Sequence, residues 1–199
     1  MARSGPRPGL DAASVLRAAA ELADAEGFEA LSLARLAQVL KVRTPSLYNH
    51  VAGLEGVRRG LAVMGVRALR DRIARAAIGK RGGEAVLAMA EAYRQFAKEH
   101  PGLYAASVRA PGRDESELAT AAADILAYLH TVLEPFGLSE EAEVHAIRAF
   151  RSVAHGFSAI ELAGGFGIPV DLDTSYRLLV RALILGLERQ AGDKQNGSA

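Results

Sequence analysis

Apolar residues recur at helical spacing along almost the whole chain, while the two-residue alternation typical of strands is nearly absent. Abundant Ala, Leu, Glu and Arg add good helix propensity. The pattern therefore predicts an all-α fold of about nine helices. Those that the pattern delimits cover residues 11–27, 32–40, 45–51, 53–78, 83–100, 115–134, 139–163 and 173–190.

Capping residues and glycines set the expected helix ends. Asp11 and Ser32 are expected N-caps, and Thr44 followed by Pro45 predicts an N-cap and a first helical residue, where the missing N–H of proline costs nothing. Glycines at 79, 82 and 83 break the long fourth helix. We expect an arm over residues 1–10, a helix-turn-helix domain over 11–60, a carboxy-terminal domain over 61–191 and a disordered tail over 192–199, with helix 53–78 as the link.

The two short helices around residue 42 suit a DNA-reading unit. In the first, Leu33, Leu36, Ala37 and Leu40 follow the spacing of one buried face. In the second, steps of about 100° per residue place Leu47 and Val51 on an inner face and Pro45, Ser46 and Asn49 opposite, with Tyr48 on the flank.

The outer residues have the chemistry that DNA contact needs. Asn49 and Ser46 are candidate base readers, and Tyr48, His50 and Thr44 are candidate phosphate contacts. Lys41 and Arg43 lie in the turn, beside helix-end N–H groups that attract phosphate. The alternative is that both helices belong to an ordinary bundle, which periodicity alone does not exclude.

Charge is uneven along the chain, although the formal net charge is only +1. Residues 35–59 contain one acid, Glu55, against five bases, and the arm adds Arg3 and Arg7. The five bases are Arg35, Lys41, Arg43, Arg58 and Arg59. Such a local excess suits phosphate neutralisation, although a charged run is also what any solvated face looks like.

Other classes of protein fit the sequence less well. There are no cysteines, no uninterrupted apolar run of 18 residues and no apolar leader, so we expect a cytoplasmic protein without disulfides. An enzyme is disfavoured because His100, His130, His145 and His155 lack metal-ligand spacing and residues 164–167 follow a helix, not a strand. No cofactor or metal is expected. A helical adaptor without DNA binding stays the other alternative.

Three segments resemble the tetracycline-repressor (TetR) family of bacterial regulators: residues 27–33 (GFEALSL), 36–42 (LAQVLKV) and 45–51 (PSLYNHV). The match covers residues 15–61. It implies a homodimer whose third helix enters the major groove of a palindromic operator, and a small-molecule effector bound by the carboxy-terminal domain. By position it implies DNA contacts from Ser32 and Leu33 on the supporting helix and from Pro45, Ser46, Tyr48, Asn49 and His50 on the recognition helix.

One position departs from the family pattern. Leu54 stands where the family usually has a lysine that contacts phosphate, and Arg58 and Arg59 are the candidates to replace it.

The last two helices carry a candidate dimer interface. Small residues at 149, 152, 156, 159 and 163 form a seam, and the final helix is apolar over most of its circumference. The candidates are Ala149, Ser152, Gly156, Ala159, Ala163, Tyr176, Leu179, Val180, Leu183 and Leu187. Packing within one subunit is the alternative. Residues 151–157 (RSVAHGF) also resemble a TetR subgroup named for a Trp-His-Gly signature, with Ala154 in place of the Trp.

A ligand cavity is expected among the middle helices. The candidates are Met64, Met89, Tyr93, Phe96, Tyr104, Tyr128, Phe150 and His155. Aromatic residues and methionines at this spacing are equally typical of a plain core, as is a buried histidine.

Overall fold

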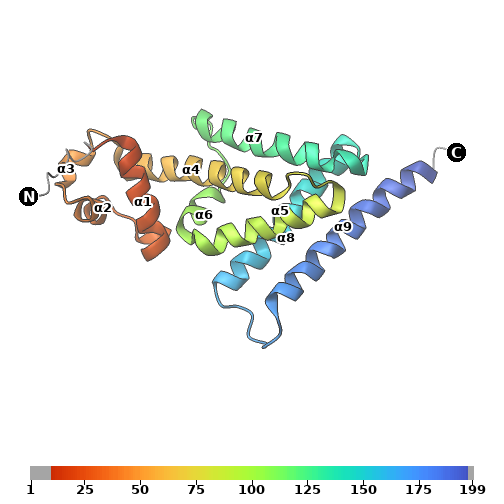
Figure 1. Ribbon diagram of the computed structural model, residues 1–199. Coiled ribbons are helices and arrows are strands. Elements are labelled where there is room, and N and C mark those ends of the chain that lie inside the picture. Colours follow the sequence, from red (N-terminus) through yellow and green to blue (C-terminus); the bar gives the residue numbers. More distant parts are fainter. Residues whose placement is uncertain (1–9, 197–199) are drawn as a thin grey trace, which may run out of the picture. The chain divides into compact units, whose positions relative to one another are not determined.

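The computed structural model describes residues 10–196, with side chains up to residue 190 (Figure 1). The expected arm, with Arg3 and Arg7, therefore lies outside the described residues except for Leu10, and so does the end of the expected tail, residues 197–199.

Every regular element of residues 10–196 is a helix, so the all-α prediction is confirmed. The α-helices are α1 (Ala12–Glu26), α2 (Leu33–Leu40), α3 (Thr44–Leu47), α4 (Gly53–Ala76), α5 (Gly82–Glu99), α6 (Pro101–Ser107), α7 (Ser116–Leu133), α8 (Glu140–Leu162) and α9 (Leu172–Asn196). Two short 3₁₀ turns, η1 (Phe28–Ala30) and η2 (Glu134–Phe136), follow α1 and α7.

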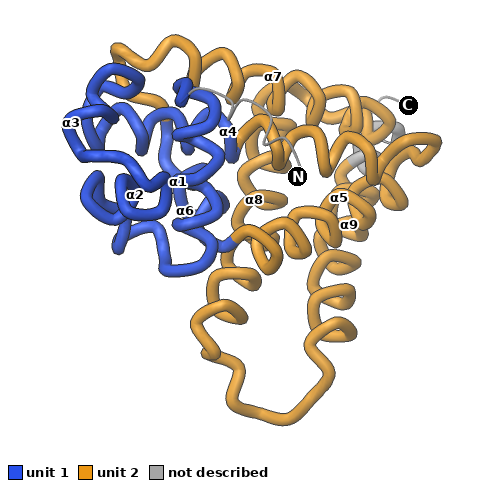
Figure 2. The backbone as a smooth tube through the Cα atoms, turned by 60° about the vertical axis from the view of Figure 1, so that its left-hand side comes forward, with its two compact units in different colours: residues 1–65, 101–110 blue, residues 66–100, 111–199 orange. Residues whose placement is uncertain are grey.

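The chain forms two compact units (Figure 2). Among the described residues, unit 1 contains 10–65 together with Pro101–Ala110, and unit 2 contains Val66–His100 together with 111–196. The helix α4 is continuous across the limit between them. The grouping of α6 with the amino-terminal helices is not indicated by the sequence pattern.

Two of the expected caps are present. The Asp11 carboxylate accepts a hydrogen bond from the Ser14 amide at 2.7 Å, and the Ser14 hydroxyl oxygen accepts one from the Asp11 amide at 3.0 Å, which makes a capping box. Ser32 accepts from the Arg35 amide at 3.2 Å and begins α2. Both bonds satisfy amides that the helix itself leaves without a partner.

Other helix ends differ from the predictions. Thr44 is the first residue of α3 and not its N-cap, which is Arg43, without a side-chain bond. Because α3 ends at Leu47, it is also shorter than predicted, and residues 48–50 form a turn. At the other end of the chain α9 extends to Asn196, beyond the predicted end at residue 190 and into the segment expected to be disordered.

In unit 1, the first turn of α6 forms hydrogen bonds with a side chain of α1. One oxygen of Asp24 accepts hydrogen bonds from the amides of Gly102 and Leu103, both at 2.9 Å. A Cβ on Gly102 would lie 2.1 Å from the Ala23 backbone, so only glycine permits this approach. Pro101 ends α5 as predicted, but it also begins α6, which the sequence pattern did not reveal.

In unit 2, α5 packs against both α8 and α9, which also pack against each other. The Tyr176 side chain on α9 is fully buried, and its hydroxyl donates to the Ala90 carbonyl of α5 at 2.7 Å. Burial raises the pKa of this phenol well above its usual value, so the group stays a neutral donor. The helix α7 packs on α5 and α8.

Candidate nucleic-acid interface

A tight turn joins α2 to α3. Lys41 ends α2 in the left-handed conformation, with φ of 57°, and the Val42 amide bonds the Ala37 carbonyl at 3.0 Å. On α3, the Leu47 side chain is fully buried, and its carbonyl accepts from the Val51 amide at 3.0 Å. The backbone beyond Leu47 therefore continues in a helix-like turn although α3 itself has ended.

The accessibility of this segment agrees with the predicted faces in part. Pro45, Tyr48 and Asn49 are exposed, with 62% of Tyr48 accessible, while Ser46 and His50 are half-buried. Val51, expected on the inner face, is half-buried. One helical turn thus presents an amide, a phenol and an imidazole together, and their contact with DNA stays a prediction.

Two of the five basic residues in this region, Arg35 and Arg58, form ion pairs with acidic side chains. The Arg35 Nε lies 3.0 and 3.1 Å from the two carboxylate oxygens of Glu26, and this hydrogen bonding lowers the pKa of Glu26. Arg58 lies 3.6 Å from both Glu29 and Glu55, and its guanidinium stands over the Phe28 ring at 5.6 Å. Glu26 and Glu29 precede the basic stretch of residues 35–59, in which Glu55 is the one acidic residue. The charge count along the sequence therefore did not include them.

The remaining three bases are available to a ligand. Lys41, Arg43 and Arg59 are exposed and make no ion pair with any residue that the structure describes. Arg58, by contrast, is half-buried, and its Nε is enclosed without a hydrogen-bond partner. Leu54, at the family's lysine position, is half-buried near the start of α4. Of the two candidates to replace that lysine, Arg59 is the one that is exposed and has no ion pair with a described residue.

Ser32 and Leu33 have structural tasks at the start of α2. The Ser32 hydroxyl is already engaged as the N-cap, and Leu33 is half-buried. The Ser32 hydroxyl can still donate, because an accepting hydroxyl oxygen keeps its own proton.

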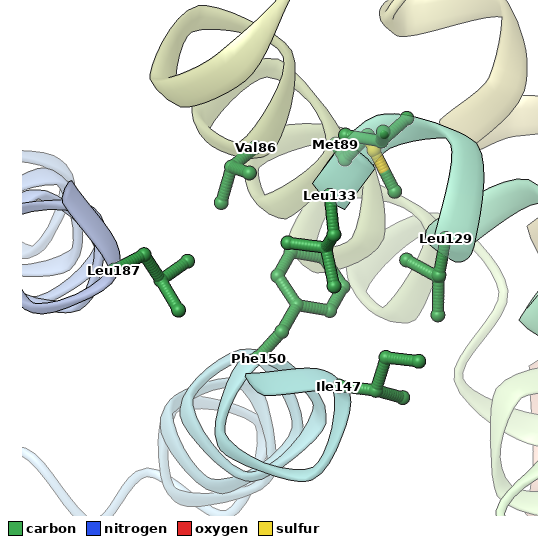
Figure 3. A pocket seen from close by; sticks show the side chains of 8 residues that line it. Val86, Met89, Leu129, Leu133, Ile147, Phe150 and Leu187 are labelled. Carbon is green, nitrogen blue, oxygen red and sulfur yellow. The ribbon is translucent and has the colours of Figure 1, made fainter. Parts of the chain in front are cut away.

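The predicted ligand residues divide between the units. Met64 and Tyr104 belong to unit 1. A cavity in unit 2 has eight lining residues, of which only Met89 and Phe150 were predicted (Figure 3). Tyr93, Phe96, Tyr128 and His155 do not line it. Tyr128 instead donates to the Ala74 carbonyl at 3.1 Å, and Phe96 is core. The lining residues that the sequence missed are Val86, Leu129, Val132, Leu133, Ile147 and Leu187.

Three of the predicted dimer residues are buried inside a single chain. Tyr176 and Val180 are inaccessible and Leu187 is 4% exposed, which corrects the expectation that they meet a partner subunit. The reason is that this side of α9 packs on α5, as the Tyr176 bond to Ala90 illustrates.

The opposite side of α9 is apolar and open. Leu178 and Leu185 are 60% and 58% exposed, and the predicted Leu179 is 40% exposed. Leu183 is half-buried. On the α8 seam, Ser152 and Ala163 are exposed, and the rest, Ala149, Gly156 and Ala159, are half-buried.

Two features of the described residues bear on the class of site. Among the described residues no helix is long and apolar enough to cross a membrane. Within the same residues, no group of three or more His, Asp or Glu side chains is arranged to hold a metal ion.

Comparison with known proteins gives consistent matches. Residues 86–183 match a family described as tetracyclin repressor-like, C-terminal domain. The HTH-type transcriptional regulator YobS of Bacillus subtilis is 37% identical over 184 residues, which are 92% of this chain and 95% of that protein. Rv0681 of Mycobacterium tuberculosis, also named an HTH-type transcriptional regulator, is 35% identical over 94% of this chain and 87% of its own.

A solved structure shares the fold. The crystal structure of a TetR variant from Acinetobacter baumannii in complex with minocycline superimposes with a TM-score of 0.68. It is 23% identical in sequence, and the match covers 92% of this chain and 99% of that one. The Trp-His-Gly subgroup is not distinguished by these matches and stays a prediction.

Proposed function

Because the chain belongs to the tetracycline-repressor (TetR) family of helix-turn-helix transcriptional regulators, we propose that it is a repressor that a small molecule releases from a palindromic operator. DNA-binding regulation is the function of the family. For this chain we further propose the residues that contact DNA, the homodimer, and the release from the operator by a small molecule. Binding to chromosomal DNA would place the protein in the cytoplasm.

The observation that carries the proposal is that Pro45, Tyr48 and Asn49 are exposed in the same short segment in which Leu47 is buried. In this assignment Asn49 and Ser46 read base edges, since an amide can pair with adenine in two places and a hydroxyl accepts either partner. Tyr48 and His50 contact phosphates on either side. Lys41, Arg43 and Arg59 supply the charge, because they are exposed and have no acidic partner among the described residues.

A dimer is needed to make this small contact set effective. One turn of helix supplies few base contacts, and two copies about 34–36 Å apart would read two half-sites on one side of the duplex. The exposed leucines of α9, with the small residues of α8, offer a self-complementary surface for such a pair.

Binding to the DNA upstream of the gene tests the assignment. We expect Asn49→Ala to weaken specific binding by about 1–3 kcal/mol, or about 5- to 150-fold, since one paired base edge is lost. Tyr48→Ala should weaken binding to operator and random DNA alike, because a phosphate contact carries no sequence information. Gel shifts with both DNAs distinguish the two effects.

Gln190→Ala is the matched control, since it removes an exposed amide from α9 and should bind as the wild type does. A folded Tyr48→Ala, Asn49→Ala double variant that still binds the operator with unchanged affinity would contradict the DNA-reading assignment.

A further inference from the structure

Lys41, the residue that ends α2, has an unusual backbone conformation. Its φ of 57° and ψ of 40° lie in the left-handed region, and within the part of the chain that the structure describes every other residue with a positive φ is a glycine. These are Gly27, Gly53, Gly79, Gly82, Gly137 and Gly164. Wherever else the described chain needs this conformation, it therefore uses the residue without a Cβ.

The turn between α2 and α3 requires the left-handed conformation whatever residue stands there. The Lys41 amide bonds the Gln38 carbonyl at 3.1 Å, and the Val42 amide bonds the Ala37 carbonyl at 3.0 Å. These two bonds form a Schellman motif, which ends a helix through one left-handed residue, usually glycine. The motif stops α2 three residues before α3 begins at Thr44, so this backbone is part of the helix-turn-helix itself.

A lysine is an unfavourable residue for this position. The left-handed backbone brings Cβ close to the following carbonyl oxygen, which lowers the folding equilibrium constant about 5- to 30-fold, and glycine escapes this penalty. Within the described chain nothing offsets the loss, because the Lys41 side chain is exposed and makes no hydrogen bond or ion pair there. Residues held in such conformations cluster at functional sites, so the partner of this side chain is to be sought outside the chain.

The chemistry and position of the side chain indicate that partner. An ammonium on a flexible four-carbon stem is a point charge that reaches a phosphate oxygen without a fixed geometry. Lys41 lies two residues before Arg43, which is also exposed without an acidic partner among the described residues, and just before the segment 45–50. If residues 45–50 read base edges, the turn lies beside the DNA backbone, where every phosphate is negatively charged.

We propose that Lys41 is a phosphate anchor that is kept in a left-handed backbone at a cost in stability, because glycine fits the turn but carries no charge. The inference rests on the proposed function, since it assumes that residues 45–50 meet operator DNA. It adds that this turn exchanges stability for affinity. A single substitution should therefore make the protein more stable and at the same time a weaker binder of DNA.

Urea unfolding of the full-length protein tests the cost in stability. Lys41→Gly should raise the folding equilibrium constant about two- to tenfold at a fixed protein concentration, because the relief of strain outweighs the larger entropy of a glycine in the unfolded chain. Lys80→Gly is the matched control, since Lys80 lies between α4 and α5 without a positive φ. There the same change relieves no strain and should lower the folding equilibrium constant.

Fluorescence anisotropy with operator and random DNA over a salt series tests the anchor. Lys41→Gly should weaken binding to both DNAs about fivefold near physiological salt and lower the slope of log K against log salt by about 0.9 per subunit. Lys41→Asn should do the same, because asparagine tolerates the left-handed backbone and is uncharged without the flexibility of glycine. Lys41→Arg should keep the wild-type slope, and Lys80→Gly should bind as the wild type does.

Each part of the inference has a result that would overturn it. A Lys41→Gly protein no more stable than the wild type would show that no strain is stored. An unchanged salt slope in Lys41→Gly and Lys41→Asn would show that Lys41 contacts no phosphate, while operator binding by the wild type stands. Weaker binding by Lys41→Gly alone would assign the effect to flexibility and not to charge. If the wild-type protein binds no upstream DNA, the proposed function fails, and the anchor fails with it.

Discussion

At the scale of single residues, Arg58 and Arg59 are neighbours with different environments. Arg58 is half-buried between Glu29 and Glu55 and over Phe28, so moving it to a phosphate would break these contacts. Arg59 is exposed and has no ion pair among residues 10–196. Successive side chains on a helix point about 100° apart. This rotation places Arg58 beside Glu29 and Glu55 and leaves Arg59 facing solvent.

We therefore predict that Arg59→Ala weakens operator binding about fivefold near physiological salt. Each phosphate contact that is lost should lower the slope of log K against log salt by about 0.9 per subunit. Fluorescence anisotropy over a salt series measures both quantities. Arg75→Ala, which removes an exposed arginine from the last turn of α4, serves as the control. An unchanged slope in Arg59→Ala would show that phosphate is contacted by other residues.

At the scale of elements, a buried arginine of α5 holds the end of α8 and the start of α9. Arg94 donates to both carboxylate oxygens of Glu161 at 2.6 and 2.8 Å and to Asp173 at 2.8 Å. Its guanidinium also stands over the rings of Phe157 and Tyr176, at 5.3 and 5.1 Å. The side chains of Arg94 and Glu161 are only 10% and 12% exposed, so each charge depends on the other.

We predict that Glu161→Gln lowers the free energy of unfolding at pH 7 by about 3 kcal/mol, because a buried guanidinium loses its main counter-charge. Arg94 holds the pKa of Glu161 below its ordinary 4.5. A carboxyl with a lowered pKa in the folded state contributes its full stability above about pH 4.5, and this contribution is lost as the pH falls through the lower folded value.

Urea unfolding between pH 3 and 7 therefore distinguishes this mechanism from simple loss of packing. The wild type and Glu161→Gln should differ most at neutral pH and converge in acid. Glu84→Gln, which changes an exposed glutamate in the first turn of α5, should follow the wild type throughout. A gap between the Glu161→Gln and wild-type curves that stays constant with pH would contradict the assigned role.

At the scale of the whole molecule, α9 has two apolar sides with different uses. Tyr176, Val180 and Leu187 face the core of their own chain, whereas Leu178 and Leu185 are exposed two helical turns apart. Exposed leucines at this spacing form one stripe, which is the surface expected of a helix that pairs with a partner.

We predict that Leu178→Asp weakens dimer formation by at least tenfold, because two charges would be brought into one symmetric contact. Analytical ultracentrifugation measures the dimer constant, and operator affinity should fall with it. Leu126→Asp makes the same change at an exposed leucine of α7 and should leave both quantities unchanged. A Leu178→Asp protein that remains as dimeric as the wild type would place the interface elsewhere.

The sequence by itself determined the features that depend on neighbours along the chain. Helical spacing, the caps at Asp11 and Ser32, and the outward positions of Pro45 and Asn49 all follow from hydrogen bonds and rotations within a few residues. The family was recognisable for the same reason, since its motif is a short stretch with fixed spacing.

Only the tertiary structure decided which of several apolar or charged faces is covered. A helix that is apolar over most of its circumference, such as α9, does not reveal which side packs on α5, so Tyr176 and Leu178 were not distinguishable by pattern. The helix α6 depends on Asp24 and Ala23, which lie far away in sequence. Likewise, the fold places Glu26 beside Arg35 and Glu29 beside Arg58, and the resulting ion pairs could not be read from the pattern. Contacts between distant segments cover these faces, and local periodicity carries no information about them.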